Sequence, residues 1–257
     1  MKIVICPDDR DLGAQAARLA SEKINAAISE RGTARIVLST GASQFTTLEA
    51  LVREDVDWTR VEMYHLDEYA GLDVTHPASF RLYLQERFIS KVRLKDVHLV
   101  DGTASGIEAL TASIRQAPVD LGLVGIGENG HIAFNDPPAD FETQEAYIFV
   151  DLNDACKRQQ VREGWFERIG DVPKQAVSMT VREILKCRSV ISAVPYAVKA
   201  DAVRKTLYED RTPDIPATVL KSHPDFTLFV DRDAFSSVDP SRIRPAEGAA
   251  FTLEYRR

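Results

Sequence analysis

The sequence has few cysteines and lacks a long apolar run. Its 257 residues include only three cysteines, Cys6, Cys156 and Cys187. They are odd in number, widely spaced and form no C-x-x-C pair, which excludes a disulfide framework and a cysteine-based zinc site. No apolar run approaches the roughly 18 residues of a membrane span, and no signal peptide precedes Lys2. We therefore expect a cytoplasmic protein with reduced, buried cysteines and no membrane anchor.

Positive charge is outnumbered by negative charge. The chain has 32 lysines and arginines against 39 aspartates and glutamates, for a formal net charge of −7. A surface of this kind is a poor match for nucleic acid or for an anionic membrane. An anionic small molecule is not excluded, because it needs only a local positive pocket. The expected partner is therefore a small molecule, with neither nucleic acid nor a membrane.

Short β-branched runs alternate with helical periodicities along the chain. The predicted strands are Lys2–Cys6, Arg35–Leu38, Val61–Leu66, Val97–Val100, Val119–Val124, Tyr147–Val150, Ala176–Met179, Ser189–Val194, Thr218–Leu220 and Phe226–Val230. The predicted helices include Leu12–Ile28, Phe45–Arg53, Ser105–Gln116, Asn153–Ile169, Val181–Leu185 and Ala197–Tyr208, and one more opens near His76–Ser79. This alternation predicts one α/β domain over residues 1–257, with a doubly wound, mainly parallel, Rossmann-like sheet and helices on both faces. From about residue 238 the pattern weakens, and Phe251–Tyr255 is either a terminal strand or irregular.

Three polar stretches follow predicted strands. Ser39–Ser43 (S-T-G-A-S) precedes a helix, Asp67-Glu68 ends another strand, and Gly125–Pro137 (G-I-G-E-N-G-H-I-A-F-N-D-P) follows the run V-D-L-G-L-V. Ligands of parallel α/β sheets gather at the carboxyl ends of the strands. Each stretch alone has an ordinary explanation as a capped turn or a solvated strand end, but together they predict one site.

The residue types in these stretches suit complementary tasks. A small loop rich in hydroxyls and glycine before a helix offers backbone N–H groups to a phosphate. A carboxylate at a strand end suits general-base work. His131 has Asp136 nearby, and a carboxylate neighbour can fix the tautomer of an imidazole that titrates near neutral pH. No set of metal ligands stands out, and we expect no metal.

Taken together, these stretches resemble the glucosamine-6-phosphate deaminase (isomerase) family. The matching segments are L-S-T-G-A-S at 38–43, L-D-E-Y-A-G-L at 66–72, H-P-A-S-F at 76–80 and the Gly125–Pro137 stretch. Their order fits the family along roughly residues 35 to 230. The related 6-phosphogluconolactonases share the D-E-Y and G-H elements, but the continuation I-A-F-N-D-P favours the deaminase side.

The resemblance implies a cofactor-free conversion of glucosamine 6-phosphate to fructose 6-phosphate and ammonia, a step of amino-sugar catabolism. Asp67 would move the C2 proton, and His131 would open the pyranose ring with Asn129 and Asp136 holding and tuning it. The implied phosphate ligands are Ser39, Thr40, Gly41, Ala42, Ser43 and Lys199, together with an arginine for which Arg158 is the first choice and Arg162 the alternative. A homo-oligomer is compatible with the sequence, which does not decide the assembly.

Two departures from the family pattern bear on activity. The family commonly has Glu where Asp136 stands, so the side chain here is one methylene shorter and either reaches by a small backbone shift or slows ring opening. The position of Asn129 is Asp in some members, and Asn can orient the histidine without adding charge. Two alternatives therefore stay open: an enzyme acting on another hexosamine phosphate or a lactone, and a non-catalytic sugar-phosphate sensor.

Overall fold

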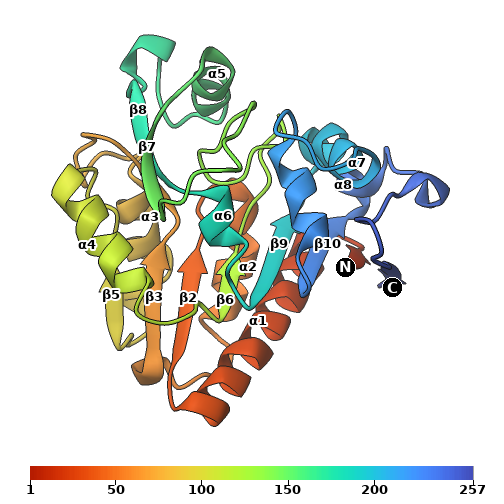
Figure 1. The fold of residues 1–257 in the computed structure, drawn as a ribbon, viewed down its shortest axis with the longest axis horizontal. Coiled ribbons are helices and arrows are strands. Elements are labelled where there is room, and N and C mark those ends of the chain that lie inside the picture. Colours follow the sequence, from red (N-terminus) through yellow and green to blue (C-terminus); the bar gives the residue numbers. More distant parts are fainter. Residues whose placement is uncertain (257) are drawn as a thin grey trace.

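Eight parallel strands form the main sheet of the protein (Figure 1). The structure is a computed structural model, and it describes residues 1–256. The strands are β1 (Lys2–Cys6), β2 (Ala34–Leu38), β3 (Val61–His65), β5 (Asp96–His98), β6 (Leu121–Leu123), β9 (Ser189–Val194), β10 (Phe226–Asp231) and β11 (Thr252–Tyr255). Their order across the sheet is β11-β1-β10-β9-β6-β2-β3-β5. The expected doubly wound α/β fold is confirmed.

Helices cover both faces of this sheet. They are α1 (Asp9–Arg31), α2 (Phe45–Leu51), α3 (Phe80–Arg87), α4 (Ala104–Ile114), α6 (Val181–Ile184), α7 (Ala200–Tyr208) and α8 (Arg232–Phe235). A further helix, α5 (Asp154–Arg162), lies away from this sheet (Figure 1). Side chains alternate between the faces along each strand. In β2, Ile36 and Leu38 pack with α1, α2 and α3, whereas Val37 packs in the core that α4, α6, α7 and α8 cover. Every side chain of β2 is therefore buried, as in a sheet covered on both faces.

A second, smaller sheet lies beyond the carboxyl ends of the main strands (Figure 1). It is antiparallel and consists of β4 (Asp67–Tyr69), β8 (Gln175–Met179) and β7 (Tyr147–Asp151) in that order. The sequence predicts β7 and β8 as strands but places them in the parallel sheet, which is wrong. Only residues 180–188 separate β8 from β9, and a crossover between parallel strands of one sheet needs a dozen or more residues. The small sheet, with α5 beside it, forms a cap over the main sheet.

Two segments differ from their predicted secondary structure. Residues Thr218–Leu220, predicted as a strand, belong to a 3-10 helix, Pro216–Ser222. Pro216 presets the backbone for a helical start, and the Thr218 hydroxyl donates to the Ile215 carbonyl (2.7 Å) instead of leaving the segment extended. The helix predicted to reach Ile169 ends at Arg162, because Gly164 adopts a positive φ of 82°.

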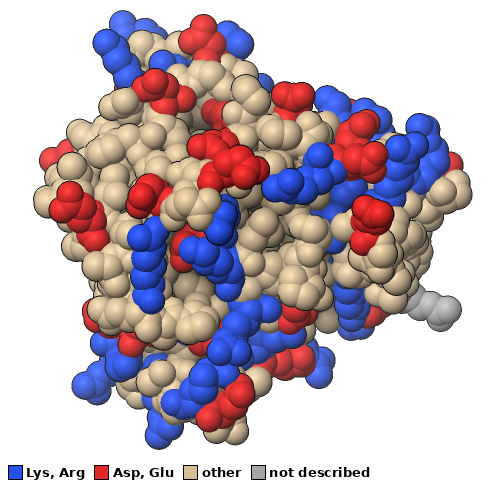
Figure 2. Space-filling model, in the orientation of Figure 1, with Lys and Arg blue, Asp and Glu red and all other residues tan. Residues whose placement is uncertain are grey.

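The carboxyl-terminal segment joins the main sheet. β11 pairs in parallel with β1, so Phe251–Tyr255 supplies a strand rather than irregular chain. Basic and acidic side chains are interspersed on the face shown in Figure 2. No helix of residues 1–256 is both long enough and apolar enough to cross a bilayer.

Candidate active site

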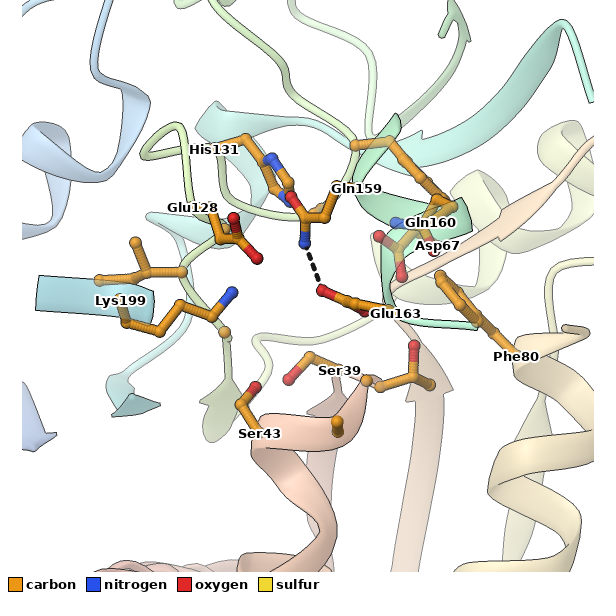
Figure 3. A pocket seen from close by; sticks show the side chains of 18 of the residues that line it. Ser39, Ser43, Asp67, Phe80, Glu128, His131, Gln159, Gln160, Glu163 and Lys199 are labelled. Atoms are coloured by element: carbon orange, nitrogen blue, oxygen red, sulfur yellow. Dashed lines mark hydrogen bonds between the residues drawn. The ribbon is translucent and has the colours of Figure 1, made fainter. Parts of the chain in front are cut away.

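A cavity of about 190 Å³ lies where the carboxyl ends of β2, β3, β6 and β9 meet the cap. Figure 3 shows side chains from these strand ends and from α5 pointing into it. Of the predicted site residues, the lining includes Ser39, Thr40, Gly41, Ala42, Ser43, Asp67, His131 and Lys199. Asn129 and Asp136 do not line the cavity, but they contact His131 at its Nδ1 atom. The three stretches expected to share one site therefore do share it.

Asp67 is the buried carboxylate of the cavity, with 5% of its surface exposed. It begins β4 just after β3 ends and pairs with Ser178 of β8. No donor among residues 1–256 forms a hydrogen bond with its carboxylate. Burial, and then the charge of neighbouring Glu68, raises the pKa of Asp67 to about 8. A carboxyl with a pKa near neutral, at the wall of a cavity, suits a general base.

His131 is held by its Nδ1 atom. This nitrogen lies 2.7 Å from Asn129 Oδ1 and 3.2 Å from Asp136 Oδ1. Because both neighbours are acceptors, Nδ1 carries the proton and Nε2 is left to face the cavity without a partner among residues 1–256. The ring packs so closely over Gly127 that a Cβ there would meet its Cε1 atom at 2.1 Å. Glycine at 127 is therefore what lets the imidazole lie in this position.

Asp136 reaches His131 despite its short side chain. Asn129 Nδ2 donates to Asp136 Oδ1 (3.1 Å), and the side-chain Oδ1 of Asn129 also accepts from the His131 backbone N–H (3.1 Å). Burial opposes ionisation of Asp136, but hydrogen bonds from His131 and Asn129 and the attraction to His131 outweigh it and lower its pKa. Asp136 therefore stays ionised and can stabilise positive charge on the ring.

Asn135, which lies between His131 and Asp136 in the sequence, has a structural role. It is buried, and its Nδ2 donates to the carbonyls of Ile132 (2.8 Å) and Met179 (2.9 Å). The Phe134 backbone N–H donates to Ser178 Oγ (3.1 Å), and Ser178 is the residue paired with Asp67. Strand β8 thus ties the histidine stretch to the strand that carries Asp67.

The Ser39–Ser43 loop leaves β2 and turns at Gly41, whose φ of 99° and ψ of 164° favour glycine. Gln44 anchors the loop by donating to Ser43 Oγ (3.0 Å) and to the Ala193 carbonyl (3.1 Å). Ser39 Oγ is buried and has no partner among the described residues. The Ser39 hydroxyl is therefore one unused polar group in the lining of the cavity.

Lys199 lies near Ser43, across the cavity from Asp67 and Phe80 (Figure 3). It ends the 3-10 turn Ala197–Lys199 before α7 and is 7% exposed. No ion pair or hydrogen bond joins its ammonium to another of the residues 1–256. Burial lowers the pKa of Lys199, an effect that Glu163 and Glu128 oppose. A buried, unpaired ammonium facing a cavity suits an anionic ligand.

The structure does not bring Arg158 to the cavity. Its side chain is exposed on α5 and is absent from the lining. Arg162, one turn further along, forms an ion pair with Glu128, which does line the cavity. Of the two arginines considered from the sequence, Arg162 is therefore the one next to the site.

The cap supplies lining residues that the sequence patterns do not reveal. They are Gln159, Gln160, Glu163 and Trp165. Gln159 donates to Glu163 (2.7 Å), and the Trp165 indole N–H donates to the other oxygen of Glu163 (3.1 Å). The polar side chains of α5 were visible in the sequence, but no pattern indicated that they face the cavity. Among residues 1–256, no group of three or more His, Cys, Asp or Glu side chains is placed to hold a metal ion.

A family model described as glucosamine-6-phosphate isomerases/6-phosphogluconolactonase matches residues 7–228. The chain belongs to this family. A curated relative, the glucosamine-6-phosphate deaminase of Streptococcus pneumoniae (strain Hungary19A-6), is 32% identical over 243 residues, which cover 93% of this chain and 100% of the relative. The deaminase of Streptococcus sanguinis (strain SK36) is 32% identical over 240 residues, or 92% of this chain and 98% of that protein.

Solved structures of the family share the fold. A monomeric glucosamine-6-phosphate deaminase superposes with a TM-score of 0.83 at 30% identity, over 93% of this chain and 100% of its own. The 6-phosphogluconolactonase from Thermotoga maritima superposes with a TM-score of 0.74 at 18% identity, over 90% of this chain and 100% of its own. The lactonase likeness concerns the fold alone, whereas the deaminase likeness extends to the sequence.

Proposed function

We propose that the protein converts glucosamine 6-phosphate and water to fructose 6-phosphate and ammonia by aldose–ketose isomerisation and deamination. The observation that carries the proposal is the convergence of Asp67, His131 and Lys199 on one cavity. These residues supply a base with a raised pKa, an imidazole with one free nitrogen and an unpaired cation. The deaminase relatives at 30% identity or more support this activity.

Asp67 acts as the base in this proposal. It takes the proton from C2 of the opened sugar and delivers it to C1, which turns the aldose into the ketose form. Its pKa of about 8 means that much of it is protonated at neutral pH before substrate binds. The ammonium group on C2 of the substrate lowers that pKa by direct attraction, so substrate binding helps to ionise the base.

His131 opens the pyranose ring. Its free Nε2 takes the proton of the anomeric hydroxyl and returns it to the ring oxygen, while Nδ1 keeps its own proton. Asp136 balances the positive charge that develops on the imidazole, and Asn129 holds the tautomer. Asp136 reaches the ring at 3.2 Å, which favours a site built around the shorter acid over one with slowed ring opening.

Lys199 and the Ser39–Ser43 loop bind the phosphate. We propose Arg162, in place of Arg158, as the arginine that contributes positive potential near the phosphate, because Arg162 pairs with Glu128, which lines the cavity. The anchored phosphate orients the sugar between Asp67 and His131, which supplies most of the positioning that the reaction needs.

We further propose that residues 1–257 work as one domain in the cytoplasm. The family model spans most of the chain, and β11 of the tail is part of the main sheet. The three cysteines are unpaired and buried, which suits a reducing compartment. The proposed reaction needs no cofactor.

A substrate panel tests the proposal. The purified protein is incubated with glucosamine 6-phosphate, a second hexosamine phosphate, and 6-phosphogluconolactone, and ammonia, ketose phosphate and acid are measured separately. We expect ammonia and fructose 6-phosphate from the first compound. Acid release from the lactone with no ammonia would place the protein with the lactone hydrolases instead.

A further inference from the structure

Asp67 and Glu68 are adjacent residues of β4, and their carboxylate side chains point to opposite sides of the strand. Neighbouring residues of a strand face opposite sides, so Asp67 faces the cavity and Glu68 faces the beginning of α3. Glu68 is completely buried and does not line the cavity. The proposed chemistry uses Asp67 and leaves this buried acid without a task.

Glu68 holds the first turn of α3. Its Oε1 accepts from the backbone N–H groups of Tyr69 (2.9 Å) and Phe80 (3.2 Å). Its Oε2 accepts from Ser79 Oγ (2.9 Å), the Arg81 backbone N–H (2.8 Å) and Arg81 Nε (3.2 Å). Five donors at a helix N-terminus hold this carboxylate in one position. Strand β4 and helix α3 are therefore fixed to each other at this point.

Tyr83, on the same helix, reaches the phosphate loop. Its hydroxyl donates to the Gly41 carbonyl (2.9 Å), and its ring stacks on Phe45 with centroids 5.6 Å apart. Gly41 is the residue with the unusual backbone angles, so this bond holds the loop at its tightest point. Phe80, between these two anchors, lines the cavity.

Helix α3 thus spans the gap between the base and the phosphate loop. We propose that Glu68 and Tyr83 are positioning residues that hold Asp67 and Gly41 at a separation matched to a sugar phosphate, although neither touches the substrate. The inference rests on the proposed function for the roles of Asp67 and the loop, and it assigns both residues an effect that the family motifs do not.

Glu68 also supplies a fixed negative charge beside Asp67. The other titratable groups near enough to sense Asp67 are Tyr69 on β4, Tyr147 on β7 and Cys156 on α5. Burial raises the pKa of each of them above its usual value, so all three are neutral over an assay range of pH 5 to 9. His131 and Lys199 line the same cavity. Glu68 is the charged group that raises the pKa of Asp67.

The first experiment uses Tyr83→Phe, which removes the hydrogen bond and keeps the stacked ring. We expect the dissociation constant for inorganic phosphate and the KM for glucosamine 6-phosphate to rise about 3- to 10-fold, with kcat within about twofold of wild type. Tyr208→Phe is the control, since Tyr208 is equally buried and its hydroxyl bonds the Asp239 backbone far from the cavity. Unchanged phosphate affinity in Tyr83→Phe, or an equal loss in Tyr208→Phe, would overturn this half of the inference.

The second experiment follows the Asp67 carboxyl directly by ¹³C NMR of aspartate-labelled protein, with Asp67→Asn identifying the signal. In Glu68→Gln the titration midpoint of the Asp67 carboxyl should fall by on the order of half a pH unit to one pH unit, because a like charge is removed. Arg81→Gln should move it up, because Glu68 loses its counter-charge, and this variant serves if Glu68→Gln does not fold. Glu183→Gln, which alters a buried acid of α6 that is paired with Lys186, is the control.

The role of Glu68 is contradicted if the titration midpoint of Asp67 stays fixed in Glu68→Gln and Arg81→Gln. It is also contradicted if the midpoint moves in the same direction in both variants. Phosphate binding and carboxyl titration need no turnover. If the wild-type protein releases no ammonia, the proposed function fails, while these two measurements still decide the positioning roles.

Discussion

Asp67→Asn should make the protein more stable while it removes activity. The folded protein keeps the Asp67 carboxyl buried and without hydrogen-bond donors, and its pKa rises from 3.8 to about 8. Between these values the folded state binds a proton that the unfolded state releases. Stability contributed by the protonated acid is therefore complete below about pH 4 and is lost as the pH rises toward 8. Asparagine has no charge to bury and avoids that loss.

The size of the effect follows from the shift. About four units at roughly 1.4 kcal/mol per unit set a ceiling of about 6 kcal/mol above pH 8. Water entering the cavity and local relaxation reduce the cost of a buried charge. We therefore expect Asp67→Asn to gain about 1–3 kcal/mol over wild type near pH 8 and much less near pH 5.

Urea unfolding of both proteins at pH 5 and pH 8, followed by tryptophan fluorescence, measures this difference. Turnover in the same preparations should fall by at least about 100-fold, as expected when a general base is removed. A stability difference that is equal at the two pH values would refute the buried, raised-pKa carboxyl. Glu108→Gln, at an exposed acid of α4, should show no comparable gain.

Three further predictions concern residues in and beside the cavity. Asp136→Glu should lower kcat by about 3- to 30-fold, because the shorter acid already reaches the imidazole and an added methylene crowds a packed site; a faster enzyme would show that the short side chain limits ring opening. Glu163→Gln should lower the KM for the sugar phosphate by about 2- to 5-fold, since a carboxylate near Lys199 repels phosphate; an unchanged KM at low and high salt would contradict this. Arg162→Ala should raise that KM by more than Arg158→Ala does, and the reverse order would restore Arg158 as the phosphate arginine.

Apart from β11, the main sheet could be predicted from the sequence because each of its other strands has a local signature. β-branched runs such as I-V-L in β2 are buried on both faces, and turn residues bound them. The small sheet could not be predicted, because β7 and β8 have the same composition as the parallel strands. What separates them is the number of residues before the next strand, and that acts through chain connectivity rather than through residue type.

The candidate site also has a part that could be predicted from the sequence and a part that could not. Asp67, His131 and the Ser39–Ser43 loop follow strands of one sheet, so topology alone brings them to one edge. Arg162 and Glu163 come from the cap, whose placement over that edge depends on the small sheet. The sequence does not show which face of α5 is turned toward the cavity or where the helix ends, and both are needed to choose between Arg158 and Arg162. The positive φ of Gly164 sets the end of the helix.

Glu68 shows a further limit of sequence patterns. The sequence D-E does not show which of the two acids faces the cavity. Only the direction of each side chain distinguishes Asp67, the proposed base, from Glu68, which holds α3. The buried hydrogen-bond partners of an acid, rather than its position in a motif, distinguish the two tasks.

The most direct test of the central claim measures products and phosphate binding in the same preparations. Wild-type protein given glucosamine 6-phosphate should release ammonia and fructose 6-phosphate in equal amounts. Asp67→Asn should release neither, while its affinity for inorganic phosphate stays within about twofold of wild type. Tight binding of the sugar phosphate by the wild-type protein with no product formed would contradict the account and would make the protein a sugar-phosphate sensor.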